Sequence, residues 1–66
     1  MIEINLIVPD LMKDQIANKE SDTFIIISSF VSRNGNILSR YYAVETTEEE
    51  ATFLVLKYGS KNVWKR

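Results

Sequence analysis

The sequence contains neither cysteine nor histidine, and it has only one proline and two glycines. Without cysteine no disulfide can form, and without either residue the usual ligands of structural zinc are missing. No glycine-rich segment is present that would cradle a phosphate. These absences exclude a disulfide-bonded domain and a zinc-stabilised domain. A core of this size rarely supplies more than about 3–5 kcal/mol, so a partner would help to stabilise the fold.

Long apolar runs are also missing, since the longest have four residues, whereas a membrane-spanning helix needs about 20. No basic segment with a long apolar stretch follows Met1, so no signal peptide is expected. We therefore expect a soluble, cytoplasmic protein with no membrane partner. Residues 1–66 are expected to form a single domain, at a size where folding buries only about 60% of the chain's surface.

The segment TFIIISSFVSRNGNILSRYYAVE, residues 23–45, predicts a β-hairpin. Asn34-Gly35 between alternating strand residues is a strong hairpin signal, because a type I′ turn needs positive φ at both central positions. A loop of these two residues would pair Arg33 with Asn36, Phe24 with Glu45 and Ile26 with Ala43.

Both faces of this hairpin are expected to be apolar. One face would carry Phe24, Ile26, Phe30, Ile37, Tyr41 and Ala43. The other would carry Ile25, Ile27, Val31, Leu38, Tyr42 and Val44. Neither face is polar enough to be simply solvated. We expect a helix to cover one face and either residues 1–22 or a partner to cover the second, with coverage by residues 1–22 preferred.

The segment TTEEEATFLVLKYG predicts a helix at about residues 47–58. Thr46 or Thr47 can begin a capping box with the glutamate three residues later, and acidic residues in the first turn suit the helix dipole. Spacings of three and four residues place an apolar stripe on the core side, and a final glycine can end the helix in the αL conformation. The stripe and the glycine are Ala51, Leu54, Val55, Tyr58 and Gly59.

The predicted fold class is α+β, with a small antiparallel sheet and the helix at about 47–58 packed on one face. The sheet would contain the hairpin 23–45, a short C-terminal strand in SKNVWKR and a candidate N-terminal strand at residues 2–8 that ends before Pro9. DLMKDQIANK predicts a short helix. Because the last strand runs parallel to the second hairpin strand, it is expected to pair with the first, which places FIIISSF in the centre of the sheet.

No residue pattern points to catalysis. Consecutive helix residues lie about 100° apart, so Glu48, Glu49 and Glu50 cannot converge on one metal ion. Ser28 and Ser29 have no histidine to act as a base. The acidic residues Asp10, Asp14, Glu20 and Asp22 show no metal-loop spacing. We expect no enzyme, no cofactor and no metal site.

Charge is distributed unevenly along the chain. Residues 1–50 carry nine acidic and four basic side chains, whereas residues 51–66 carry four basic and no acidic ones. This asymmetry suggests contact with a partner that has an acidic surface, although lysines also finish helices for structural reasons. Trp64 lies in the basic end and is either a binding residue or part of the core. The predicted partner-binding residues are Lys61, Trp64, Lys65, Arg66, Tyr41 and Phe30.

RYYAVETTEEEATFLVLKYG…VWKR resembles small phage-encoded inhibitors of bacterial RNA polymerase, through a pattern that covers residues 23–66. The matching residues are Ala43, Glu45, Thr46, Glu50, Ala51, Tyr58 and Arg66. The resemblance implies a protein of the host cytoplasm that binds and occludes a host protein such as RNA polymerase. It also implies that Lys65 and Arg66 contact an acidic surface, but neighbouring strand residues point to opposite faces, so they cannot serve one patch.

EEEA…YGSKNVWKR is similar to the archaeal large-subunit ribosomal protein LX. That resemblance implies an RNA-contacting role through Lys61, Lys65 and Arg66. The net charge of −1 argues against it, whereas an exposed stacking platform of Phe24, Phe30 and Tyr41 would favour it. A homodimeric structural subunit, paired through open sheet faces or N-terminal edge strands, is the third alternative.

Overall fold

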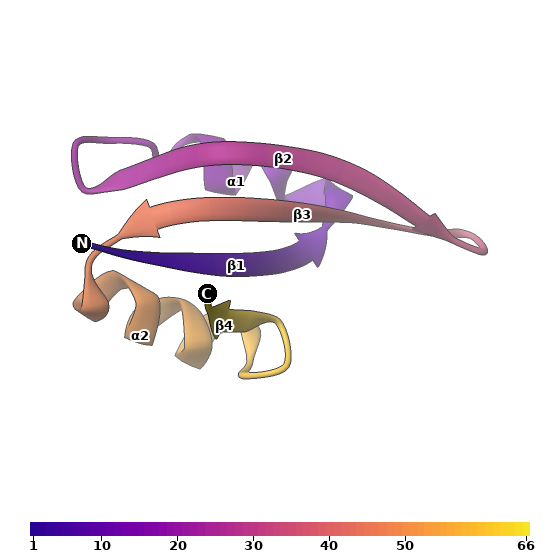
Figure 1. Cartoon of the computed structure of the whole chain (residues 1–66). Coiled ribbons are helices and arrows are strands. Elements are labelled where there is room, and N and C mark those ends of the chain that lie inside the picture. Colours follow the sequence, from indigo (N-terminus) through magenta and orange to yellow (C-terminus); the bar gives the residue numbers. More distant parts are fainter.

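The computed structural model describes all 66 residues and shows an α+β fold with one antiparallel sheet (Figure 1). The strands, in the sheet order β2-β3-β1-β4, are β2 Phe24–Asn34, β3 Ile37–Thr46, β1 Ile2–Pro9 and β4 Val63–Lys65. The helices are a 3-10 turn η1 Asp10–Met12, a short α1 Lys13–Ala17 and α2 Glu48–Tyr58. No helix has the length and apolar character needed to cross a bilayer.

The order of the strands differs from the expected one. The N-terminal strand β1 lies inside the sheet, paired with β3 along its whole length from Ile2 opposite Thr46 to Pro9 opposite Ser39. Its other side pairs with β4, so FIIISSF lies in the edge strand β2 and the central position predicted for it is wrong. Ile4, Leu6 and Val8 alternate along β1, so all three point to one face of the sheet and are buried.

The hairpin turn is displaced by one residue from the prediction. Asn34 pairs with Ile37 and Arg33 with Leu38, so the two loop residues are Gly35 and Asn36. Gly35 has φ of 64°, and no residue other than glycine has a positive φ. Glycine at the first central position is the requirement of a type II′ turn, which also suits the twist of a hairpin. The predicted Asn34-Gly35 loop and its register are therefore wrong.

A β-bulge at Ile27 changes which residues of β2 share a face. Ile26 pairs with Val44, but Ser28 pairs with Ala43, so one residue of β2 is inserted between these pairs. The insertion reverses the alternation of side chains. Phe24 therefore lies in the core and Phe30 on the opposite side of the sheet, although the sequence pattern predicted that they share a face.

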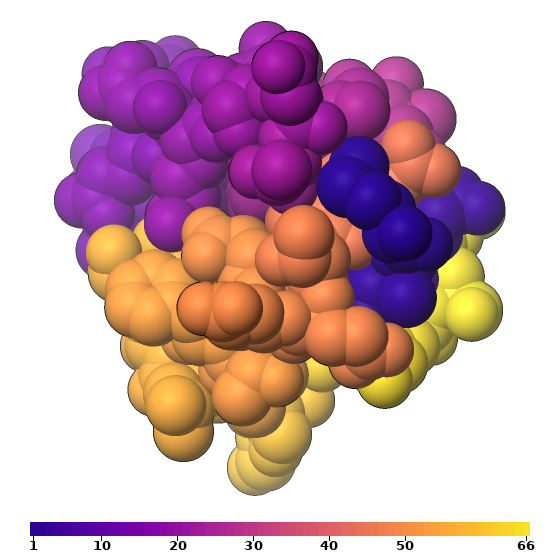
Figure 2. All heavy atoms as spheres, turned by 90° about the vertical axis from the view of Figure 1, so that its left-hand side faces the viewer, coloured from indigo at the N-terminus to yellow at the C-terminus, as the bar shows by residue number.

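The core lies between one face of the sheet and both helices. Its ten residues are Ile4, Leu6, Val8, Ile16, Phe24, Tyr42, Val44, Ala51, Leu54 and Val63. Burying each large side chain of this kind stabilises the fold by about 1.5–3 kcal/mol. Because α1 and α2 lie side by side on the same face (Figure 2), the preferred prediction that residues 1–22 cover the second face is wrong.

Helix α2 begins and ends through local interactions. The Thr47 hydroxyl accepts a hydrogen bond of 3.1 Å from the main-chain N–H of Glu50, so Thr47 rather than Thr46 is the N-cap. Gly59 ends the helix with φ of 93° and ψ of 149°, which is a glycine-favouring conformation but not the predicted αL one. The predicted stripe faces the core, with Val55 and Tyr58 partly buried.

Candidate functional site

The side of the sheet that faces away from both helices is uncovered, and we call it the open face. Strand alternation places on it the neighbours of the buried core residues. The residues used to define it are Asn5, Ile7, Ile25, Ser28, Phe30, Ile37, Tyr41, Ala43, Trp64 and Arg66. Four large apolar residues of the open face are exposed: Ile25, Phe30, Ile37 and Trp64. The open face therefore leaves a large apolar area in contact with water.

Three aromatic side chains from three strands gather on the open face. Phe30 on β2 lies opposite Tyr41 on β3, with ring centroids 5.0 Å apart and ring planes within 4° of parallel. Trp64 on β4 is 42% exposed and lies opposite Asn5 on β1. Together with Arg66 they line a hollow of about 310 Å³. The structure thus brings together four of the six predicted partner-binding residues.

The remaining two predicted residues lie elsewhere. Lys65 points to the helix side of the sheet, where its Nζ is 3.0 Å from Glu48 Oε2. Lys61 lies in the turn between α2 and β4, is exposed and forms no ion pair within the chain. Neither lysine lines the hollow on the open face. The opposite directions of Lys65 and Arg66 follow the expected alternation along a strand.

Two of the four cations at the C-terminal end, Lys65 and Arg66, pair with acidic residues of the chain. Arg66 Nη1 lies 3.3 Å from Glu3 Oε1, and the Arg66 main-chain N–H donates to the Glu3 carbonyl oxygen at 3.1 Å. Lys57 Nζ lies 5.9 Å from the ring centroid of Phe53 and 5.4 Å from that of Tyr58. The predicted cluster of Lys61, Lys65 and Arg66 is therefore not one surface patch.

The residues that sequence reasoning missed are the small and polar ones between the aromatic rings. Asn5, Ser28 and Ala43 line the same hollow as Phe30 and Tyr41. Asn5 is the only polar residue inside the run INLIV. It would have indicated an uncovered side if the expected N-terminal strand had been placed in the interior of the sheet. The position of Ser28 on the open face could not be predicted without the bulge at Ile27.

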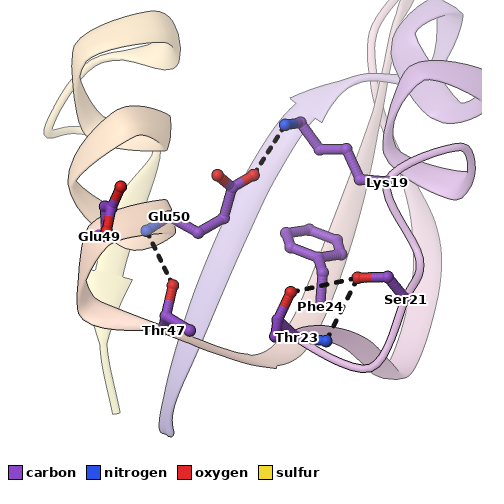
Figure 3. Close-up of a pocket in the computed structure, with 7 residues that line it drawn as sticks. All are labelled: Lys19, Ser21, Thr23, Phe24, Thr47, Glu49 and Glu50. Carbon is purple, nitrogen blue, oxygen red and sulfur yellow. Dashed lines mark hydrogen bonds and ion pairs between the residues drawn. The ribbon is translucent and has the colours of Figure 1, made fainter.

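A second hollow, of about 380 Å³, lies between α2 and the loop after α1 (Figure 3). Lys19 crosses it and places Nζ 2.7 Å from Glu50 Oε1 and 4.8 Å from the ring centroid of Phe53. Thr23, which lines the hollow, accepts a hydrogen bond of 2.7 Å at its carbonyl oxygen from the hydroxyl of the buried Thr46. These interactions join the two helical segments, and no unpaired buried side chain points into this hollow. We interpret it as a structural junction.

The side chain of Tyr42 is buried in the core. Burial raises the pKa of Tyr42 above its usual 10.0, and the nearby Arg40 opposes this rise. Arg40 itself pairs with Asp10, with Nε 2.8 Å from Oδ1. No group of three or more metal-ligating side chains occurs. The hydroxyl of Tyr58 is buried and has no hydrogen-bond partner in the protein.

Comparison with known proteins identifies no relative. No family model matches the chain, and no curated protein or solved structure is significantly similar to it. The resemblances to the phage inhibitors and to ribosomal protein LX thus depend only on the residues quoted for them.

Proposed function

We propose that the chain is a non-enzymatic protein-binding module whose binding surface is the open face, and that it acts by covering part of its partner. The observation that carries this proposal is the uncovered cluster of Phe30, Tyr41, Trp64 and Arg66 around one hollow. Tyr, Trp and Arg are enriched among residues that dominate binding energy, and large exposed apolar patches mark interaction sites.

The hollow indicates what the partner should present. Its walls are aromatic or small, and its cation is Arg66, so an apolar side chain next to a carboxylate would fit it. Such a carboxylate would compete with Glu3, whose pair with Arg66 is about half exposed at 51% and 48% and therefore contributes little stability. The sequence predicted a partner with an acidic surface. In our proposal, that surface presents one carboxylate beside an apolar side chain.

A host protein such as RNA polymerase is the first partner to test, because the resemblance to the phage inhibitors implies it. The route through Lys65 is unsupported, since that lysine pairs with Glu48 on the other side of the sheet. In our proposal the contact runs through Arg66 and the aromatic rings.

RNA binding is the second candidate, favoured by the stacked Phe30 and Tyr41 on an exposed sheet. Two observations weaken it. Phe24, the third ring of the expected platform, is buried in the core at 2% exposure. Arg66 is the only cation that lines the hollow, and the strand positions beside it carry Glu3 and Glu45, whereas affinity for RNA depends largely on phosphate neutralisation.

The test compares Phe30→Glu with the matched control Leu56→Glu. Both residues are highly exposed, at 61% and 81%, but Leu56 lies on α2, away from the open face. Each variant would be titrated against purified bacterial RNA polymerase, against a protein captured from bacterial lysate by the unmodified chain, and against a generic hairpin RNA. Thermal melts would verify that both variants fold.

We expect Phe30→Glu to weaken protein binding by at least tenfold, as loss of a hot-spot residue does, and Leu56→Glu to bind like the unmodified chain. Binding of RNA alone, abolished by Phe30→Glu, would establish the second candidate instead. Equal affinity of both variants for every ligand would show that the open face is not the binding surface.

A further inference from the structure

The two edges of the sheet differ in how well they are protected. Strand β4 has three residues and ends in Lys65, followed by Arg66. Strand β2 has eleven residues, no proline and a single charged residue, Arg33 near its end. Proteins usually protect sheet edges by short strands, charges, prolines or bulges. The bulge at Ile27 is the only such device in the apolar part of β2.

The free edge of β2 is also apolar. Ser21 forms an isolated bridge with Phe24, which satisfies the main chain of the first residue of β2 on its free side. Beyond Phe24, no strand pairs with β2 on that side. The exposed fractions along the strand are 39% for Ile25, 51% for Ile27, 61% for Phe30 and 48% for Val31. A long apolar edge of this kind is a template for another strand.

We infer that β2 pairs antiparallel with β2 of a second copy of this chain and joins the two sheets into one. This inference goes beyond the proposed function, because it concerns an edge of the sheet and leaves both open faces free. The free edge of β2 presents unpaired main-chain N–H and C=O groups, and β2 of a second copy presents the same groups to pair with them.

The charges at the two ends of β2 support self-pairing in the antiparallel direction. Glu20 and Asp22 lie just before the strand and Arg33 lies near its end; all three are exposed and form no ion pair within the chain. Antiparallel pairing about a two-fold axis brings Arg33 of each copy beside the acidic end of the other, twice per dimer. Parallel pairing would instead bring like charges together, which is unfavourable.

The same pairing closes the assembly. In the joined sheet both outer edges are β4 strands, which are short and basic. Further copies then find no long free edge, so a dimer rather than an open fibre is expected.

The experiment measures the oligomeric state of the full chain by sedimentation across the micromolar range. The charge variants are Arg33→Glu and the double variant Glu20→Lys/Asp22→Lys, and Lys61→Glu is the control, since Lys61 lies in the turn before β4, away from β2. Each charge variant alone should raise the dissociation constant of the dimer about tenfold or more, because two attractive contacts become repulsive. Lys61→Glu should dimerise normally.

A mixture of the two charge variants provides the decisive measurement, since a mixed dimer restores both attractive contacts. We expect the mixture to dimerise with the affinity of the unmodified chain, although each variant alone does not. A chain that stays monomeric throughout the micromolar range would overturn the inference. So would a dimer that is unaffected by both charge variants, or a mixture that associates no better than its components.

Discussion

Phe30 of β2 and Tyr41 of β3 stack face to face on the open face, and the bulge at Ile27 is the reason that they meet. With unbroken alternation from the core residue Phe24, Phe30 would point toward the helices. One inserted residue therefore turns an apolar side chain from the core side to the binding side. The candidate site depends on this irregularity of the strand.

The stack should contribute measurable coupling to stability. We expect a double-mutant cycle of Phe30→Ala and Tyr41→Ala to give a coupling free energy of about 0.5–1.5 kcal/mol, the range of aromatic pairs. Urea unfolding of the four proteins provides the measurement. Ile37→Ala combined with Tyr41→Ala is the control: Ile37 pairs with Asn34 on the same face, and its effect should be additive. A Phe30–Tyr41 cycle that is equally additive would contradict a stabilising stack.

Thr47→Ala should destabilise the protein by about 1 kcal/mol, because it removes the N-cap hydrogen bond to the main-chain N–H of Glu50. Thr52→Ala is the matched control within the same helix. The Thr52 hydroxyl only donates to the carbonyl oxygen of Glu48 at an exposed position, and alanine favours a helix interior. Thermal melts of both variants should show a lower melting temperature for Thr47→Ala alone. Equal melting temperatures would contradict the capping role.

Tyr42 should make the protein less stable at high pH. Burial raises its pKa in the folded state above 10.0, so between the unfolded and folded pKa values the unfolded chain binds fewer protons than the folded one. The stabilisation is therefore complete below about pH 10 and is lost as the pH rises through the folded pKa. Tyr42→Phe should reduce this alkaline loss, measured as the free energy of unfolding in urea at several pH values. An unchanged pH profile would show that Tyr42 is not responsible.

Elements that are specified by residues close together in the sequence were predicted well. The helix at about 47–58 is observed at Glu48–Tyr58, because its cap, its acidic first turn and its apolar stripe all lie within twelve residues. The β1 strand was also expected, because Ile4, Leu6 and Val8 carry the alternation that identifies it. It includes Pro9, whereas the prediction ended it before Pro9. Local signals of this kind need no knowledge of the partners in the sheet.

The arrangement of the strands required information that no short segment contains. Either Asn34-Gly35 or Gly35-Asn36 satisfies the preference for glycine and asparagine in a two-residue turn, and the structure uses the second pair. A strand that is apolar on both sides suggested a central place for β2, yet the strand lies at the edge. Both β1 and β2 carry enough apolar residues for an interior position in the sheet. Only the packing of the whole sheet decides which strand takes it.

Only part of the candidate site was predicted, because the sequence does not show which side of the sheet each side chain faces. Trp64 and Arg66 were chosen because they lie in the basic C-terminal end, and Phe30 and Tyr41 as candidates for an exposed aromatic platform. The four residues meet around one hollow. Lys61 and Lys65 were chosen for charge, but charge along the sequence does not reveal direction. The pair between Lys65 and Glu48 links residues on different elements and was invisible to a count of charges.

The interior position of β1 has a consequence for the order in which the protein folds. Residue 2 pairs with residue 46, so β1 is synthesised well before β3 and must wait for it before the two strands can pair. The β2–β3 hairpin closes over a loop of two residues and can form within about 1–10 µs. Long-range pairings of β1 are slower, because loop closure costs entropy before any contact compensates for it. Until β1 arrives, the edge of β3 that it will occupy is as free as that of β2, and the growing chain is then most prone to associate with other chains.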